Sequence, residues 1–152
     1  MTSDRGTFLI DSNVLVYTLD VSEEAKQLVA LDVVARLGVS GRGRLSVQVL
    51  GESFNAMTRK IKPSRSTDEA ETVVLSYAAT WPVLDLTPQL AREAIRGSRE
   101  HQMSYWDAQI WATAKLNGIP TIITEDRQDG RTIEGVMTIN PFAASFDLGV
   151  LD

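Results

Sequence analysis

The stretch that decides the fold is Thr7-Phe8-Leu9-Ile10-Asp11-Ser12-Asn13. Phe8, Leu9 and Ile10 form an apolar run without alternation, which is typical of a strand buried on both faces of a sheet. Asp11 ends the run, and Ser12 and Asn13 are suited to cap the short helix that follows. The acid therefore lies where open α/β sheets place their functional sites. Taken alone, Asp11 is better interpreted as a turn or cap residue.

Outward from this stretch, short apolar runs alternate with amphipathic segments. We expect strands at 8–10, 44–46, 83–86, 121–124 and 136–139, and helices at 14–17, 20–38, 47–62, 67–80, 88–101 and 104–117. Strands separated by helices indicate a parallel sheet with helices on both faces. The sequence therefore predicts one α/β domain over 1–152 with five parallel strands, and leaves the tail from about residue 140 unassigned.

The composition of the chain excludes several classes of functional site. A chain of 152 residues without cysteine has no disulfides, no thiolate zinc site and no cysteine nucleophile. It lacks an apolar run of membrane-spanning length, and its start, Met1 to Gly6, is polar, so we expect a cytoplasmic protein without a membrane partner. The net charge of −5 argues against a nucleic-acid partner, unless some of the acids bind cations.

Three further acidic residues are candidates for the same site as Asp11. Asp126 follows the apolar Ile122 and Ile123 as Asp11 follows the first strand, although a loop rich in Asp and Gly also uses Asp as a turn former. Asp107 stands three residues after Ser104, a spacing that also predicts a capping box. Glu52 falls on the polar side of its helix, where a solvated side chain is the simpler interpretation. Glu125 and Asp129 are close enough in sequence to Asp126 to contribute.

Four segments together resemble the PIN-domain family, in particular the VapC-type toxin ribonucleases of bacterial toxin–antitoxin pairs. They are 8–15, the helix that carries Glu52, 104–110 and 123–130. The resemblance implies a PIN-like α/β domain in which Asp11, Glu52, Asp107 and Asp126, with Asp129 as a further candidate, hold divalent metal. Gly130 departs from the pattern, because many relatives carry an aromatic residue there, and this departure bears on Asp129.

The resemblance further implies an endoribonuclease that hydrolyses RNA phosphodiester bonds. Carboxylates suit Mg²⁺ or Mn²⁺, and one or two such ions activate water and stabilise the leaving oxygen. The implied partners are RNA, a small antitoxin protein and a second copy of the chain in a homodimer. Phe142, Phe146 and Leu148 in the tail are candidate interface groups. The single histidine, His101, gives little support to histidine-based catalysis.

Two basic groups could bind RNA phosphates. Arg59 and Lys60 cluster after the Glu52 helix, and Arg92, Arg96 and Arg99 recur at helical spacing. For each group a solvated helix face is a slightly better interpretation. Trp106 and Trp111 could stack on bases, but core packing is the more common use of tryptophan.

Two other functions stay open at this point. A receiver-like signalling module would accept phosphate on a strand-end Asp, but needs paired acids after the first strand, and Asp11-Ser12-Asn13 supplies one. A catalytically silent PIN-like binding protein is the other alternative, and the presence of all four acids speaks against it.

Overall fold

The strands lie in one sheet whose parallel members all end on the same side of the molecule. The computed structural model describes residues 6–152; Met1–Arg5, most of the polar start, lie outside the described residues. The sheet has six strands in the order β3-β2-β1-β4-β6-β5. They are β1 (Phe8–Ile10), β2 (Gly43–Ser46), β3 (Val83–Leu84), β4 (Thr121–Ile123), β5 (Thr132–Ile133) and β6 (Val136–Ile139). The predicted parallel α/β architecture is confirmed.

The expectation of five strands is wrong by one. The additional strand, β5, pairs antiparallel with β6. It follows a polar segment of the sequence and was not predicted. Its two residues, Thr132 and Ile133, are too few to produce a visible alternation. Glu134 and Gly135 between the two strands both have positive φ, which closes the hairpin tightly.

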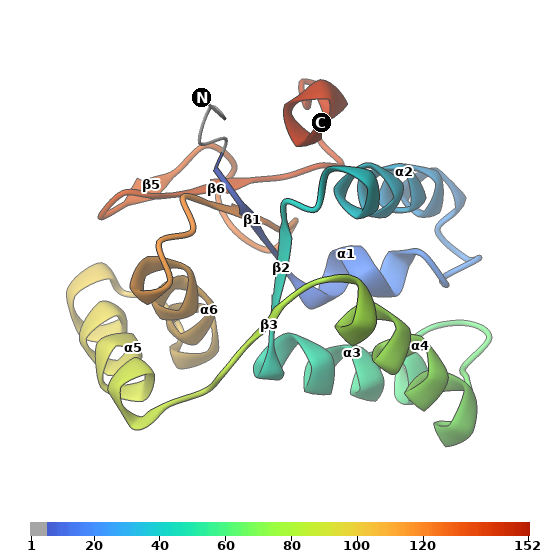
Figure 1. Ribbon diagram of the computed structural model, residues 1–152, viewed down its shortest axis with the longest axis horizontal. Coiled ribbons are helices and arrows are strands. Elements are labelled where there is room, and N and C mark those ends of the chain that lie inside the picture. The colour runs from blue at the N-terminus through green and yellow to red at the C-terminus, as the bar shows by residue number, and fades with distance from the viewer. Residues whose placement is uncertain (1–5) are drawn as a thin grey trace.

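Helices cover both faces of the sheet, with α5 and α6 on one side of β1 and β2 and the other helices opposite (Figure 1). They are α1 (Ser12–Tyr17), α2 (Glu24–Ser40), α3 (Val47–Arg59), α4 (Thr67–Thr80), α5 (Pro88–His101) and α6 (Tyr105–Leu116). Ser46, Thr87 and Ser104 cap their helices through their hydroxyl groups, and the cap at Ser104 is the one that the sequence spacing predicts. Several helix bounds differ from the expectation. Asp11 itself caps α1, α2 begins at Glu24 and runs to Ser40, ending at Gly41 in the left-handed conformation, and α3 ends at Arg59 rather than at 62.

The tail folds back on the domain. After β6 it ends in a short 3-10 helix, η1 (Leu148–Leu151), which contacts α2 and buries Leu151 completely. The Arg42 guanidinium donates to the backbone oxygens of Val150 and Asp152 at 2.9 and 2.8 Å. Phe142, Phe146 and Leu148 pack partly buried against the core, which leaves less of them for an interface.

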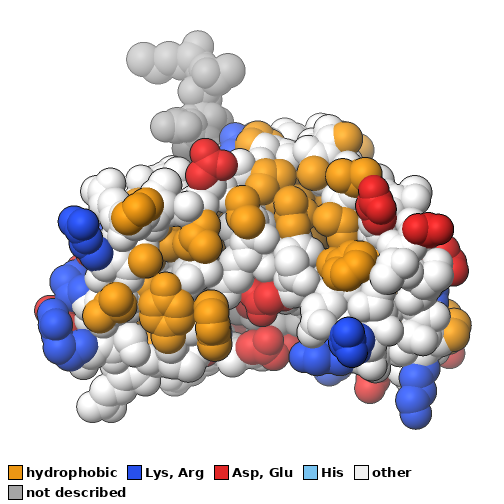
Figure 2. Space-filling model, turned by 90° about the horizontal axis from the view of Figure 1, so that it is seen from below, with side chains coloured by type: hydrophobic (Ala, Val, Ile, Leu, Met, Phe, Trp, Pro, Cys, Tyr) orange, Lys and Arg blue, Asp and Glu red, His pale blue; other side chains and the backbone are white. Residues whose placement is uncertain are grey.

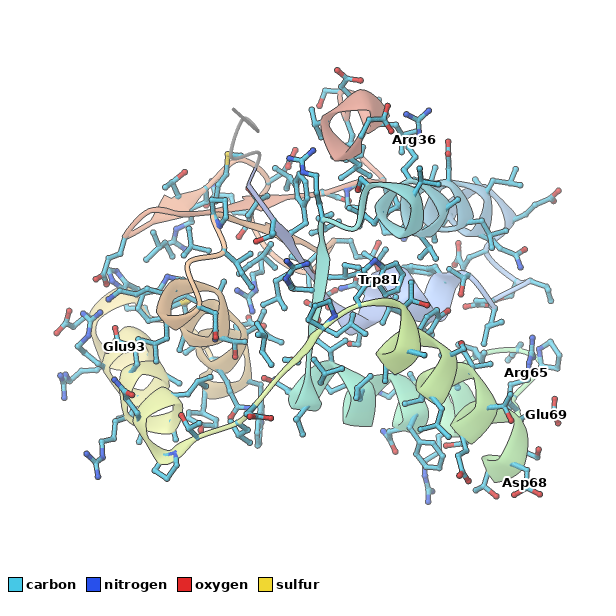
Figure 3. The ribbon with its side chains drawn as sticks, viewed as in Figure 1. Arg36, Arg65, Asp68, Glu69, Trp81 and Glu93 are labelled. Carbon is cyan, nitrogen blue, oxygen red and sulfur yellow. The ribbon has the colours of Figure 1, made fainter. Side chains whose placement is uncertain are left out.

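Two buried tryptophans fix the helices to the sheet. Trp81, labelled in Figure 3, lies in the interior near α2 and donates its indole N–H to the Leu37 oxygen at 3.1 Å. Trp111 of α6 is 1% exposed and lies against Gly97 of α5. A Cβ at Gly97 would approach the Trp111 ring to 2.5 Å, so the absence of a side chain there sets the distance between α5 and α6.

We predict that Gly97→Ala destabilises the protein by about 1–3 kcal/mol, because the buried ring cannot move aside. Gly38→Ala is the matched control: Gly38 is also inside a helix, but an added Cβ there meets nothing within 4 Å. The control should gain up to about 1 kcal/mol from helix propensity. Urea unfolding of both variants measures the difference, and equal stability changes would contradict the packing argument.

Candidate active site

Asp11 lies where β1 and β4 end side by side. Ile10 pairs with Ile123, and the Asp11 backbone N–H donates to the Ile123 oxygen at 3.0 Å. The Asp11 carboxylate accepts from the backbone N–H of Ser12 at 2.7 Å, so it does act as a cap. The residue is only 6% exposed, and a buried carboxylate at a strand end is more than a cap requires.

Asn13 joins the two strand ends. Its side-chain amide donates to the Thr124 hydroxyl at 2.9 Å and to the Asp126 carboxylate at 3.0 Å. The Thr124 hydroxyl also accepts from the Asp126 backbone N–H at 3.1 Å. These bonds hold Asp126 beside the end of β1, although it is 115 positions from Asp11 in the sequence.

Glu52 and Asp107 reach the same region from helices. Gln48, one turn before Glu52 in α3, accepts from the Gln109 side chain at 2.8 Å and donates to the Trp106 oxygen at 3.2 Å. This polar bridge fixes α3 against the start of α6. Of the predicted capping box, the structure shows the half in which the Asp107 backbone N–H donates to the Ser104 hydroxyl at 3.2 Å.

Two pockets meet at Asp126. The larger, of about 600 Å³, includes Glu52, Lys60, Trp106 and Asp126 in its lining. The smaller, of about 180 Å³, includes Asp107, Asp126 and Arg127 in its lining. Figure 2 views the side on which the strands end, and shows acidic side chains in the middle of the face with hydrophobic groups to either side. The acids therefore line an open surface that a polymer could cross.

Arg127 is a charged residue beside the acids that the sequence analysis did not single out. Its side chain is 10% exposed, its guanidinium donates to the Asp107 backbone oxygen at 2.7 Å, and it lies 3.7 Å from the Asp107 carboxylate. Its Nε is buried without a hydrogen-bond partner. The signal in the sequence was its place directly after Asp126, in a loop rich in Asp and Gly. The structure instead makes it a fixed positive charge among the acids.

The electrostatics of the site follow from burial and crowding. Burial raises the pKa of Asp11, and the nearby Arg127 and the bonds from Thr124 and Ser12 oppose that rise. The pKa of Glu52 is raised, first by loss of hydration in the pocket and then by repulsion from Asp11. Burial lowers the pKa of Arg127, while attraction to Asp11, Asp107 and the other site acids offsets part of this. The acids and Arg127 thus form one interacting set.

The neighbouring acids are engaged elsewhere. Glu125 forms a salt bridge with Lys26 at 2.9 Å and accepts a short hydrogen bond from the Tyr17 hydroxyl. Asp129 accepts from the Asn140 backbone N–H at 2.8 Å and lines a separate pocket with Phe8 and Arg42. The structure therefore brings Asp11, Glu52, Asp107 and Asp126 together and places Asp129 apart from them.

The two basic groups also differ. Lys60 lines the larger pocket, with Arg59 exposed beside it on α3. Arg96, in contrast, pairs with Glu93, Glu100 and Glu134 in a network with Lys115 (Glu93 is labelled in Figure 3). The helix stripe of Arg92, Arg96 and Arg99 is therefore interrupted at its centre by carboxylates.

A second group of potential metal ligands lies away from the strand ends. Among the described residues, Glu100, His101 and Glu134 bring ligand atoms within 4.8 Å of one another. His101 contacts Glu134 at 2.6 Å, but Arg96 and Lys115 pair with the same Glu134 carboxylate. These cations already neutralise the group.

No helix within residues 6–152 has the length and apolar character needed to cross a membrane.

A mostly parallel sheet with Asp11 and Asp126 at its strand ends, and with Glu52 and Asp107 facing the same region from α3 and α6, defines a carboxylate site in an α/β domain. The chain belongs to the PIN domain family, whose model matches residues 8–132. No curated protein sequence matches it.

Solved structures share the fold at low sequence identity. A toxin–antitoxin complex from Klebsiella pneumoniae is similar, with 18% identity, a TM-score of 0.63, and coverage of 89% of this chain and 98% of that one. VapBC2 from Rickettsia felis, bound to a promoter DNA fragment, has 13% identity, a TM-score of 0.64 and coverage of 88% and 98%. VapC20 from Mycobacterium tuberculosis, a toxin that cleaves the sarcin–ricin loop, has 18% identity, a TM-score of 0.56 and coverage of 76% and 87%.

We predict that Asp11→Asn stabilises the metal-free protein increasingly as pH rises above about 4. Because the folded-state pKa of Asp11 is raised, the folded chain holds this proton to higher pH than the unfolded chain, so ionisation lowers the free energy of unfolding. The asparagine cannot ionise, and it should gain on the order of 1–3 kcal/mol at neutral pH. Urea unfolding in EDTA across pH tests this, with the exposed Asp85→Asn as a control for the lost charge. A stability loss that does not vary with pH would show that Asp11 acts only as a cap.

Proposed function

We propose that this protein is a metal-dependent endoribonuclease and the toxin of a toxin–antitoxin pair. The observation that carries the proposal is the convergence of Asp11 and Asp126 through Asn13, with Glu52 and Asp107 facing the same surface. Membership of the PIN domain family supports it. That membership also argues against the receiver-like alternative, whereas a silent binding protein is separated from an enzyme by the cleavage test below.

The donor set fits a hard divalent cation. Asp11, Glu52, Asp107 and Asp126 offer only oxygen, as Mg²⁺ and Mn²⁺ prefer. Among the described residues, these acids do not form a closed group of the kind that Glu100, His101 and Glu134 do. Mg²⁺ binds through one or two carboxylates and keeps several waters, so an open set suits it. One or two ions would occupy this place, and Asp129 would act at most in support.

Each side chain then has a part in hydrolysis. A bound ion would supply an activated water and charge stabilisation at the phosphodiester. Asp11 and Asp126, held at the strand ends by bonds from Ser12 and Asn13, would hold that ion. Glu52, whose pKa is raised, is suited to take up or release a proton at the edge of the larger pocket. Arg127 offsets part of the repulsion among the carboxylates.

The partners follow from the similar structures. Two of them are toxin–antitoxin complexes, which supports a small antitoxin that covers the acidic pocket of this chain. We further propose a homodimer in the cytoplasm. Exposed apolar side chains on the middle helices, such as Leu75 at 59% exposure, are better interface candidates than the tail.

We predict that the partner-free protein cleaves single-stranded or loop RNA with Mg²⁺ or Mn²⁺, and that EDTA abolishes the cleavage. Asp11→Asn and Asp126→Asn should reduce the rate by at least about 100-fold, because each removes an anionic ligand. Glu100→Gln, which alters the other carboxylate group, should cleave like the parent. Gel analysis of a structured RNA measures this. Cleavage that persists in EDTA, or that is equal in all variants, would overturn the metal mechanism.

We predict that Lys60→Ala weakens RNA binding and lowers the salt slope of the binding constant by roughly one unit, as expected for one lost phosphate contact. Arg92→Ala is the matched control, since Arg92 is an exposed cation on α5 that lies outside the lining of both pockets. Its slope should stay unchanged. Fluorescence anisotropy at several salt concentrations, with Asp11→Asn as background to prevent cleavage, provides the measurement. An effect confined to Arg92 would move the RNA path to α5.

A further inference from the structure

Trp106 is the most exposed of the three tryptophans by a wide margin. It is 65% exposed, whereas Trp81 and Trp111 are 2% and 1% exposed. The sequence analysis favoured core packing for both Trp106 and Trp111, and for Trp106 this is wrong. A tryptophan that contributes so little to the core needs another explanation.

The surroundings of Trp106 point to a ligand with a flat ring. It lines the larger pocket together with Glu52 and Asp126, and it directly precedes Asp107. Its backbone oxygen is held by Gln48, and its ring meets Tyr105 edge to face, with centroids 5.1 Å apart at 74°. The backbone of Trp106 is thus held by Gln48 and its ring contacts Tyr105, yet most of the residue's surface is open beside the acids.

The rest of the pocket has the composition of a nucleotide site. Val16, Ala56 and Ile61 contribute apolar surface, Lys60 contributes a positive charge, and Asn13 and Asn55 contribute amides. Its volume of about 600 Å³ lies within the usual range for small-ligand sites. An aromatic face, a cation and apolar contacts are the elements with which proteins hold unpaired nucleotides.

We infer that Trp106 stacks on an unpaired base of the RNA next to the phosphodiester that the acids address. The inference rests on the proposed ribonuclease function and adds the residue that contacts the substrate next to the cleaved bond: Trp106 requires at least one base turned out of the RNA. A duplex keeps its bases stacked on one another, so it cannot supply this contact. Since stacking reads every base through its π-face, Trp106 selects unpaired structure more than sequence.

The test uses tryptophan fluorescence of the full chain, because the other two indoles are buried and a ligand at the pocket acts first on Trp106. With Asp11→Asn as background to prevent cleavage, a short single-stranded RNA should quench the emission saturably. A hairpin stem of the same sequence should not. Trp106→Ala should abolish the quenching and weaken binding by about 5- to 150-fold, whereas Trp106→Phe should retain most of the affinity.

Val39→Ala is the matched control, since Val39 is 93% exposed near the end of α2 and lies outside the lining of both pockets. It should bind RNA like the background protein. If anisotropy shows that RNA binds without quenching, and Trp106→Ala binds as tightly, the inference fails while the nuclease proposal stands. A blue shift that grows with protein concentration alone would mean that a second copy covers the ring, and would also overturn it. If no RNA is bound or cleaved, both proposals fall.

Discussion

The hydrogen bonds from the Asn13 side chain to Thr124 and Asp126 connect the two strand ends on which the site depends. Both strands are three residues long, so their backbone hydrogen bonds alone do not fix the loops that follow them. The Asn13 side chain therefore sets the position of Asp126 relative to the end of β1. Asp11 starts the helix that carries Asn13, so one carboxylate helps to place the other.

The site also carries an electrostatic cost. Several carboxylates gather near the ends of β1 and β4, and burial raises the pKa of Asp11 against the attraction of Arg127. Arg127 is itself buried, with an Nε that lacks a partner, which a residue selected for stability alone would avoid. Local choices that oppose stability are concentrated at functional sites. The rest of the domain, with its capped helices and its tail bound through Arg42, supplies the stability that offsets them.

Much of this arrangement could be predicted from the sequence. Apolar runs such as Phe8–Ile10 and Thr121–Ile123, separated by helical segments, were sufficient to predict the parallel sheet, and Ser104 caps α6 as expected. β5 could not be predicted, because two residues show no periodicity. The burial of Arg127 and the exposure of Trp106 were also missed, since both run against the usual preference of their residue types. A buried arginine and an exposed tryptophan depend on tertiary packing, and here both lie beside the acids.

Direct titration with Mn²⁺, followed by electron paramagnetic resonance of the free ion, tests the central claim without RNA or partner. The account predicts saturable binding by the parent protein, a marked loss of affinity in Asp126→Asn, and unchanged binding in Glu134→Gln, which removes a carboxylate from the other acidic group. Binding that survives Asp126→Asn but is lost in Glu134→Gln would place the metal at Glu100, His101 and Glu134 and contradict the account.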